Sequence, residues 1–79
     1  MLMKEKYFEP TDETSFRLWM FSLALEELKK KPHNTGKVSN LLGKVATFAN
    51  GNWVKYNASA EQKDDLNKVL TELQLLAAD

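Results

Sequence analysis

The hydrophobic residues of this chain repeat with helical spacing in two separate stretches. Both stretches place apolar side chains at i, i+3, i+4, i+7, i+10 and i+11, a spacing that gathers them on one face of an α-helix. The first contains Val38, Leu41, Leu42, Val45, Phe48 and Ala49. The second contains Leu66, Val69, Leu70, Leu73, Leu76 and Ala77. The pattern therefore predicts amphipathic helices over about residues 37–49 and 60–77.

A third helix is predicted over about residues 12–31. Asp12 and Glu13 follow Pro10, and acids in a first turn suit the positive end of the helix dipole. Three lysines fill the last turn, where the dipole favours cations, and Pro32 ends the helix. The segment His33–Gly36 is the expected turn to the next helix.

This helix differs from the others because its apolar residues form two sectors. One sector contains Phe16, Trp19, Met20, Leu23 and Ala24, and the other contains Leu18, Phe21, Leu25 and Leu28. The simpler interpretation is a central helix that contacts both of its neighbours. The alternative is that one sector binds another molecule, since large bare apolar patches are uncommon on soluble monomers.

The ends of the predicted helices are marked by cap and turn residues. Ser59 and Gln62 have the spacing of a capping box at the start of the last helix. Asn50–Gly51 should end the middle helix, with one of the two residues in the left-handed conformation. Between these signals, residues 50–58 are expected to form a short helical turn or an extended linker rather than a hairpin.

A chain of 79 residues is long enough for one small domain. Residues 1–10 show no periodicity and are expected to form a flexible N-terminal segment that frays, with packing of Tyr7 and Phe8 back on the helical domain as the alternative. Residues 11–79 are expected to form a single helical domain. The predicted fold is all-α, a small antiparallel three-helix bundle with helices over about 12–31, 37–49 and 60–77.

Charge is distributed unevenly along a chain whose formal net charge is zero. No acid occurs between Leu28 and Ala60, a stretch that carries six lysines, whereas each end of the chain has a net charge of −3. Helix dipoles explain the three lysines at 29–31, but they do not explain Lys37, Lys44 and Lys55. The central lysines are therefore candidates for steering a charged partner.

The composition argues against several classes of function. The chain has no cysteine and a single histidine, so thiol chemistry, a disulfide framework and a cysteine- or histidine-rich metal site are excluded. No recognisable nucleophile or acid–base set is present, and we expect no enzymatic activity and no cofactor. The absence of cysteine and of a long apolar run favours a cytoplasmic protein that does not enter a membrane.

The favoured interpretation is a small non-enzymatic binding or regulatory protein that acts through protein–protein contact. Its partner is another protein or a second copy of itself, and the candidate surface combines the first helix with a basic rim that suits an acidic partner. The alternative is nucleic-acid binding, with loop aromatics stacking on bases beside lysines. The candidate residues are Trp19, Met20, Phe21, Lys37, Lys44, Trp53, Lys55 and Tyr56.

Overall fold

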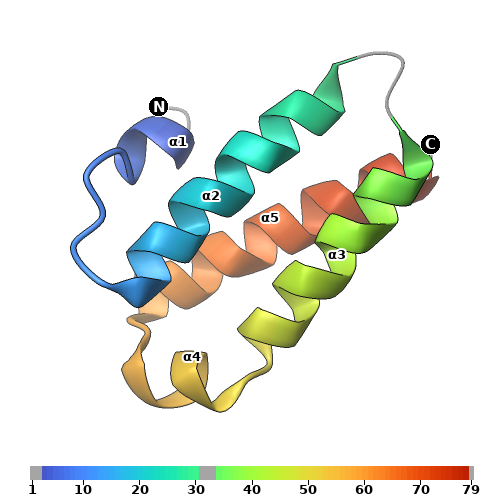
Figure 1. The fold of residues 1–79 in the computed structure, drawn as a ribbon. Coiled ribbons are helices and arrows are strands. Elements are labelled where there is room, and N and C mark those ends of the chain that lie inside the picture. The colour runs from blue at the N-terminus through green and yellow to red at the C-terminus, as the bar shows by residue number, and fades with distance from the viewer. Residues whose placement is uncertain (1–2, 31–33, 79) are drawn as a thin grey trace.

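The computed structural model describes residues 3–30 and 34–78, with the backbone alone for residues 3 and 4. These residues form five helices and no strand (Figure 1). In chain order the helices are α1 (Met3–Lys6), α2 (Glu13–Lys29), α3 (Thr35–Ala49), α4 (Asn52–Asn57) and α5 (Ala60–Ala78). The predicted all-α class is confirmed, but the described chain adds two short helices to the three long ones that the sequence predicts.

The long helices α2 and α5 run in the same direction, as two contacts between them show. Near their starts, the Gln62 side chain donates to Ser15 Oγ at 3.1 Å. Near their ends, Lys29 Nζ lies 2.8 Å from Glu72 Oε1. Helix α3 returns in the opposite direction and contacts both, with its larger contact on α5 (Figure 1).

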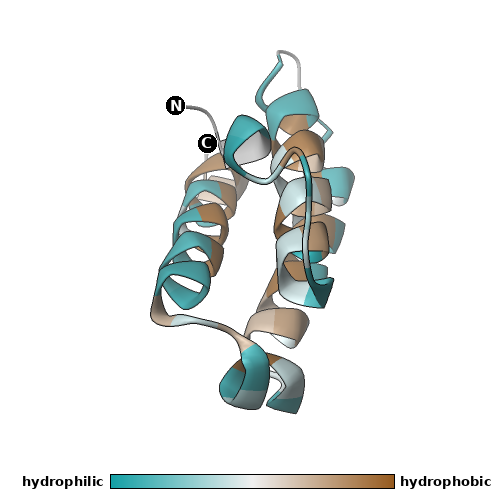
Figure 2. Cartoon of the chain, turned by 90° about the vertical axis from the view of Figure 1, so that its left-hand side faces the viewer, coloured by the Kyte–Doolittle hydropathy of each residue, from teal (hydrophilic) through white to brown (hydrophobic). Residues whose placement is uncertain are grey.

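The core forms where the three long helices meet. Both predicted apolar stripes face it, so brown and teal segments alternate along the long helices in Figure 2. The largest fully buried hydrophobic side chains are Leu18, Val38, Val45, Leu66, Val69 and Leu73. Burial of apolar area is the main favourable contribution to folding, and these positions account for the helical spacing in the sequence.

Polar caps set the helix boundaries. Asp12 is the N-cap of α2, and its Oδ1 accepts a hydrogen bond from the Ser15 amide at 2.7 Å. The predicted capping box of α5 is confirmed, since the Ser59 and Gln62 side chains each accept from the other's backbone amide. Helix α3 begins two residues before its predicted start because Asn34 caps it by accepting from the Lys37 amide.

The predicted left-handed residue at Asn50–Gly51 is wrong. Asn50 has φ −94° and Gly51 has φ −80°, so neither lies in the left-handed region. The last carbonyls of α3 find other donors: the amide and the side chain of Asn50 both donate to Ala46 O, and the Gly51 amide donates to Phe48 O. Gly51 then serves as the N-cap of α4, the helical alternative among those predicted for residues 50–58.

The N-terminal arm, residues 3–10, lies beside α2 (Figure 1). Tyr7 is buried and belongs to the core, whereas Phe8 is 69% exposed. The predicted flexibility of residues 1–10 stays a prediction, which hydrogen exchange of their amides would test.

The predicted end of the first long helix at Lys31 is wrong: α2 ends at Lys29, and Lys30 is its C-cap with extended backbone. Pro32 and His33 themselves, the predicted helix stop and turn, lie outside the described residues.

Across the described ranges, none of the helices combines the length and the hydropathy needed to cross a bilayer.

Candidate functional site

The two apolar sectors of α2 have opposite environments. Leu18, Phe21 and Leu25 are at most 4% exposed and form part of the core. The other sector is open to solvent, and its members Phe16, Met20 and Leu23 are 41%, 39% and 36% exposed. We call Phe16, Trp19, Met20 and Leu23 the outer face of α2. It is an apolar helix surface that the described residues leave partly uncovered, and a contiguous exposed patch of large apolar side chains commonly marks an interaction site.

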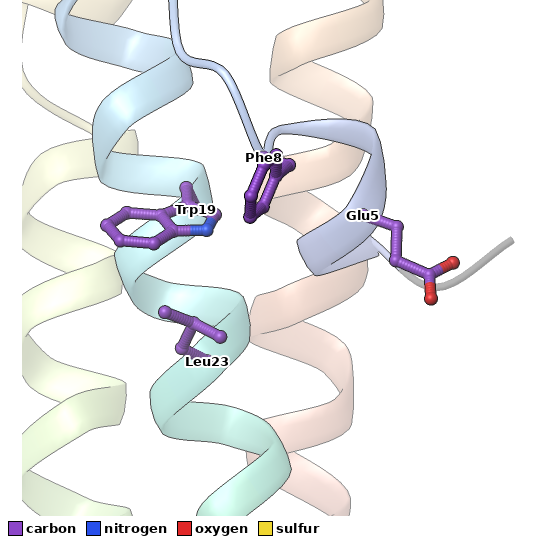
Figure 3. A pocket seen from close by; sticks show the side chains of 4 residues that line it. All are labelled: Glu5, Phe8, Trp19 and Leu23. Atoms are coloured by element: carbon purple, nitrogen blue, oxygen red, sulfur yellow. The ribbon is translucent and has the colours of Figure 1, made fainter.

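One edge of the outer face forms an open pocket with the N-terminal arm. The pocket has a volume of about 500 Å³ and is lined by Glu5, Phe8, Trp19 and Leu23. Figure 3 shows the Phe8 ring standing beside Trp19, with Leu23 one turn further along α2 and the Glu5 carboxylate directed outward. The lining is mostly apolar with one charged group, as in sites that bind an apolar side chain or a small ligand.

Aromatic contact extends the apolar surface along α2 from the pocket. The rings of Phe16 and Trp19 have centroids 6.2 Å apart and an interplanar angle of 34°. Trp19 is half-buried, since it packs against the core as well as lining the pocket. A half-buried Trp is held in place and still presents apolar area, a combination that suits recognition.

The arm is held against α5 by a polar cluster centred on Asp65. This carboxylate is 3% exposed, and it accepts a hydrogen bond from Tyr7 Oη at 2.5 Å and one from Lys6 Nζ at 2.8 Å. Burial acts to raise the pKa of Asp65, but the hydrogen bonds from Lys6 and Tyr7 and the nearby positive charges outweigh it, and the net pKa is lowered. The cluster fixes Tyr7 and thereby the position of the adjacent Phe8.

The residues predicted on the first helix separate in the structure. Trp19 and Met20 belong to the outer face, with Trp19 at the pocket. Phe21 is only 4% exposed and makes an edge contact with Phe48, with ring centroids 6.0 Å apart. Because helix geometry turns Phe21 toward α3, it contributes to the core and is removed from the candidate surface.

The predicted basic and aromatic residues lie on α3 and α4. Lys37, Lys44 and Lys55 are exposed. Trp53 is 47% exposed, and its indole Nε1 donates to the buried Thr14 Oγ1 at 3.0 Å, which ties α4 to the start of α2. Tyr56 is 74% exposed. Trp53 therefore combines a structural contact with an accessible ring surface.

Three pocket residues, Glu5, Phe8 and Leu23, and the buried acid Asp65 were not among the predicted site residues, although Leu23 belongs to an apolar sector that the sequence showed. Phe8 and Glu5 come from a segment without periodicity, so the sequence carries no signal that places them beside α2. For Asp65 the sequence does carry a signal. The residue lies four positions before Val69, at the edge of the apolar stripe of α5, so its burial follows from the helical spacing. The charged residue that lines the pocket is an acid and not one of the predicted lysines.

The sequence matches no protein-family model and no curated protein, and the fold matches no solved structure. Inference about function therefore depends on the residues of the outer face and the pocket.

Proposed function

We propose that this chain is a small non-enzymatic binding protein, regulatory in role, that acts by contacting another protein through the outer face of α2. The observation that carries the proposal is the exposure of three large apolar residues on a helix whose opposite side packs into the core through Leu18, Phe21 and Leu25. Such a surface loses contact with water when a partner covers it, which is the main favourable contribution to most protein–protein association.

The scaffold behind this face is proposed to be an antiparallel three-helix bundle of α2, α3 and α5, with α1 and α4 as additions. The inner sector of α2 packs into the shared core, so the outer side chains project from a helix that is fixed along its length. Fixing the binding side chains before the partner arrives lowers the entropic cost of association. The proposed compartment remains the cytosol, on the absence of cysteine.

The composition of the outer face supports a protein partner. Trp, Phe and Met are enriched at the centres of protein interfaces, and a few such residues commonly carry most of the binding energy. The pocket between Phe8 and Trp19 offers a place for one anchoring side chain of the partner. A small metabolite would need several convergent polar groups for orientation, whereas the lining residues provide one charged group.

Affinity capture from the native host with three baits tests the proposal. The baits are the wild type, Leu23→Glu on the outer face, and Leu75→Glu as a matched control on α5, where Leu75 is 67% exposed. We expect a partner retained by the wild type and by Leu75→Glu but lost with Leu23→Glu. Equal retention by all three folded baits would contradict the proposed surface.

Nucleic-acid binding is the second candidate, and the exposure of Tyr56 beside Lys55 on α4 favours it. The Lys55 Nζ lies 5.4 Å from the centroid of the Tyr56 ring, so an aromatic face and a cation occur together at the surface. Bases stack on such rings while lysines contact phosphate. Anisotropy titration of labelled single-stranded and duplex probes at low salt tests this function, and no uptake of either probe would end it.

A further inference from the structure

We infer that the outer face of α2 receives a basic amphipathic helix of another protein, with an apolar side chain of that helix in the pocket beside Trp19. This inference rests on the proposed function and specifies its partner. Three features carry it: the spacing of the apolar residues, the acidic charge around them, and the lack of a free base that a second copy could offer to the acids among the described residues of this face.

The spacing of the outer face favours a helical occupant. Phe16, Trp19, Met20 and Leu23 fall at i, i+3, i+4 and i+7, so they form a ridge along α2. A second helix packs on such a ridge by placing its own side chains between them. Recognition of an amphipathic helix in an apolar groove commonly uses anchors with this same spacing.

The charge around the face favours a basic occupant. Residues 5–27 contain six acids and two bases. Glu13 and Glu27 are compensated locally, by Arg17 at 2.9 Å and by Lys30 at 3.0 Å. Glu5 lines the pocket and Glu9 follows Phe8 in the chain; both are exposed, and neither forms an ion pair with a residue that the structure describes.

The described bases of this region do not neutralise those two acids. Lys6 is the nearest described cation in sequence, and its Nζ is directed to α5, where it contacts Asp65 and Glu61. Arg17 lies over the ring of Phe48, 5.5 Å from its centroid, on the side of α2 that faces α3. Lysines or arginines of a partner would therefore meet the carboxylate of Glu5 at the pocket and that of Glu9 next to Phe8 in the chain, neither of which is paired with a described base. Such complementary charge increases both the association rate and the specificity of binding.

The same charges argue against a second copy of this chain. A two-fold symmetric dimer through the outer face would place each surface patch against its own counterpart. In such a contact residue i of one copy meets residue j of the other. Among the described residues of the outer face and the arm, no free base could serve as the partner of Glu5 or Glu9, since Lys6 is paired with Asp65 and Arg17 with Glu13. We therefore expect a monomer in sedimentation equilibrium.

Two helical model peptides of equal length test the inference directly. Both carry the same leucine stripe at i, i+3, i+4 and i+7, one flanked by lysines and the other by glutamates. Binding is followed by the emission of Trp19 in a Trp53→Phe background, where Trp19 is the remaining tryptophan. At low salt we expect the lysine peptide to bind about tenfold more tightly, with the preference shrinking as salt is added.

Variants distinguish the inference from the proposed function. The double variant Glu5→Gln and Glu9→Gln should remove the lysine preference while leaving apolar binding, and Leu23→Glu should weaken binding of both peptides. Circular dichroism would confirm that each variant keeps its helix content. Equal binding of the two peptides, or a preference for the glutamate peptide, would overturn the basic partner and leave the proposed surface standing.

Two further outcomes are decisive. If neither peptide binds but the capture experiment returns a partner that depends on Leu23, the helical occupant is wrong and the proposed function stands. If neither peptide binds and capture does not depend on Leu23, both the inference and the proposed function are wrong. A dimer in sedimentation equilibrium that Leu23→Glu dissociates would replace the basic partner with a second copy of this chain.

Discussion

The phenol of Tyr7 donates a hydrogen bond of 2.5 Å to the carboxylate of Asp65, a residue 58 positions further along the chain. The contact joins the N-terminal arm to α5 at a carboxylate that is almost fully buried. Because Phe8 follows Tyr7 directly, the same bond helps to hold Phe8 in the wall of the pocket. Arm docking and the shape of the candidate binding surface are therefore linked.

Removing this hydroxyl should destabilise the protein. In Tyr7→Phe the ring still fills its place in the core, but Asp65 loses a donor in a buried setting, at a cost of about 1–3 kcal/mol. Urea unfolding at neutral pH measures the change. Tyr56→Phe is the matched control, since Tyr56 is exposed and should alter the unfolding free energy by no more than about 0.5 kcal/mol. Equal effects of the two substitutions would contradict the role of the Tyr7 contact.

Stability should fall in acid because Asp12 and Asp65 both have lowered pKa values. For Asp65, burial alone would raise the pKa, but the donors Lys6 and Tyr7 outweigh it; for Asp12, the main cause is the hydrogen bond from the Ser15 amide. A carboxyl whose pKa is lower in the folded state contributes stability above its unfolded pKa, close to 3.8. That contribution is lost as pH falls through the folded pKa.

The pH dependence of unfolding by urea tests this linkage. The wild type should lose stability steeply below about pH 4. Asp65→Asn should be less stable than the wild type at neutral pH and should show a flatter decline in acid, because one of the two carboxyls no longer titrates. If the unfolding free energy of the two proteins fell equally steeply with decreasing pH, the lowered pKa of Asp65 in the folded state would be contradicted.

At high pH the protein should lose stability as the pH rises, because Lys6 and Tyr7 both have raised pKa values. The pKa of Lys6 is raised chiefly by its hydrogen bond to Asp65, and that of Tyr7 chiefly by burial. Groups with raised folded pKa values contribute stability below their unfolded values, 10.5 and 10.0, and lose it above them. The unfolding free energy should therefore decline as the pH is raised from about 9 to 11. The decline should be smaller in Tyr7→Phe, because the variant lacks one of the two groups that cause it.

Two leucines on α5 provide a matched pair for testing the core. Leu73 is fully buried, whereas Leu75, two residues later, is 67% exposed. Leu73→Ala should cost about 2–5 kcal/mol because it leaves a cavity, enough to unfold much of a protein this small at room temperature. Leu75→Ala should change stability by at most about 0.5 kcal/mol. Thermal unfolding followed by circular dichroism compares them, and similar losses would contradict the assigned register of α5.

Gly43 offers a substitution expected to stabilise the fold. It lies within α3, and apart from its chain neighbours and the backbone of its own helix, a methyl group added at its Cα would meet no described atom within 4 Å. Alanine has the higher helix propensity and restricts the unfolded chain, so Gly43→Ala should add about 0.5–1 kcal/mol. The urea midpoint of the variant measures the gain. A loss of stability would contradict the open surface at Gly43.

Much of the helical architecture could be predicted from the sequence because it depends on local signals. The stripes that contain Val38 and Leu66, the stop after Ala49 and the capping box at Ser59 all act over a few residues, and each recurs in the structure. The prediction of a left-handed residue at Asn50–Gly51 was wrong because the carbonyls at the end of α3 accept hydrogen bonds from Asn50 and Gly51 without that conformation.

The candidate site was less predictable because it depends on contacts between distant segments. The two sectors of α2 were visible in the sequence, but which sector faces the core is decided by α3 and α5. The prediction that grouped Phe21 with Trp19 and Met20 ignored this choice. Phe8 and Glu5 lie at the pocket on an arm that the Tyr7–Asp65 hydrogen bond helps to hold in place, a pairing over a long sequence separation for which no periodic signal exists.

The most direct test of the central claim is a chemical-shift footprint of the captured partner on the isotope-labelled protein. If the outer face of α2 is the binding surface, the largest backbone shifts should cluster at residues 16–23 and at the adjoining arm around Phe8. Leu23→Glu should abolish them, and Leu75→Glu should leave them in place. Shifts confined to α4, around Trp53 and Tyr56, or to the lysines of α3 would contradict the account.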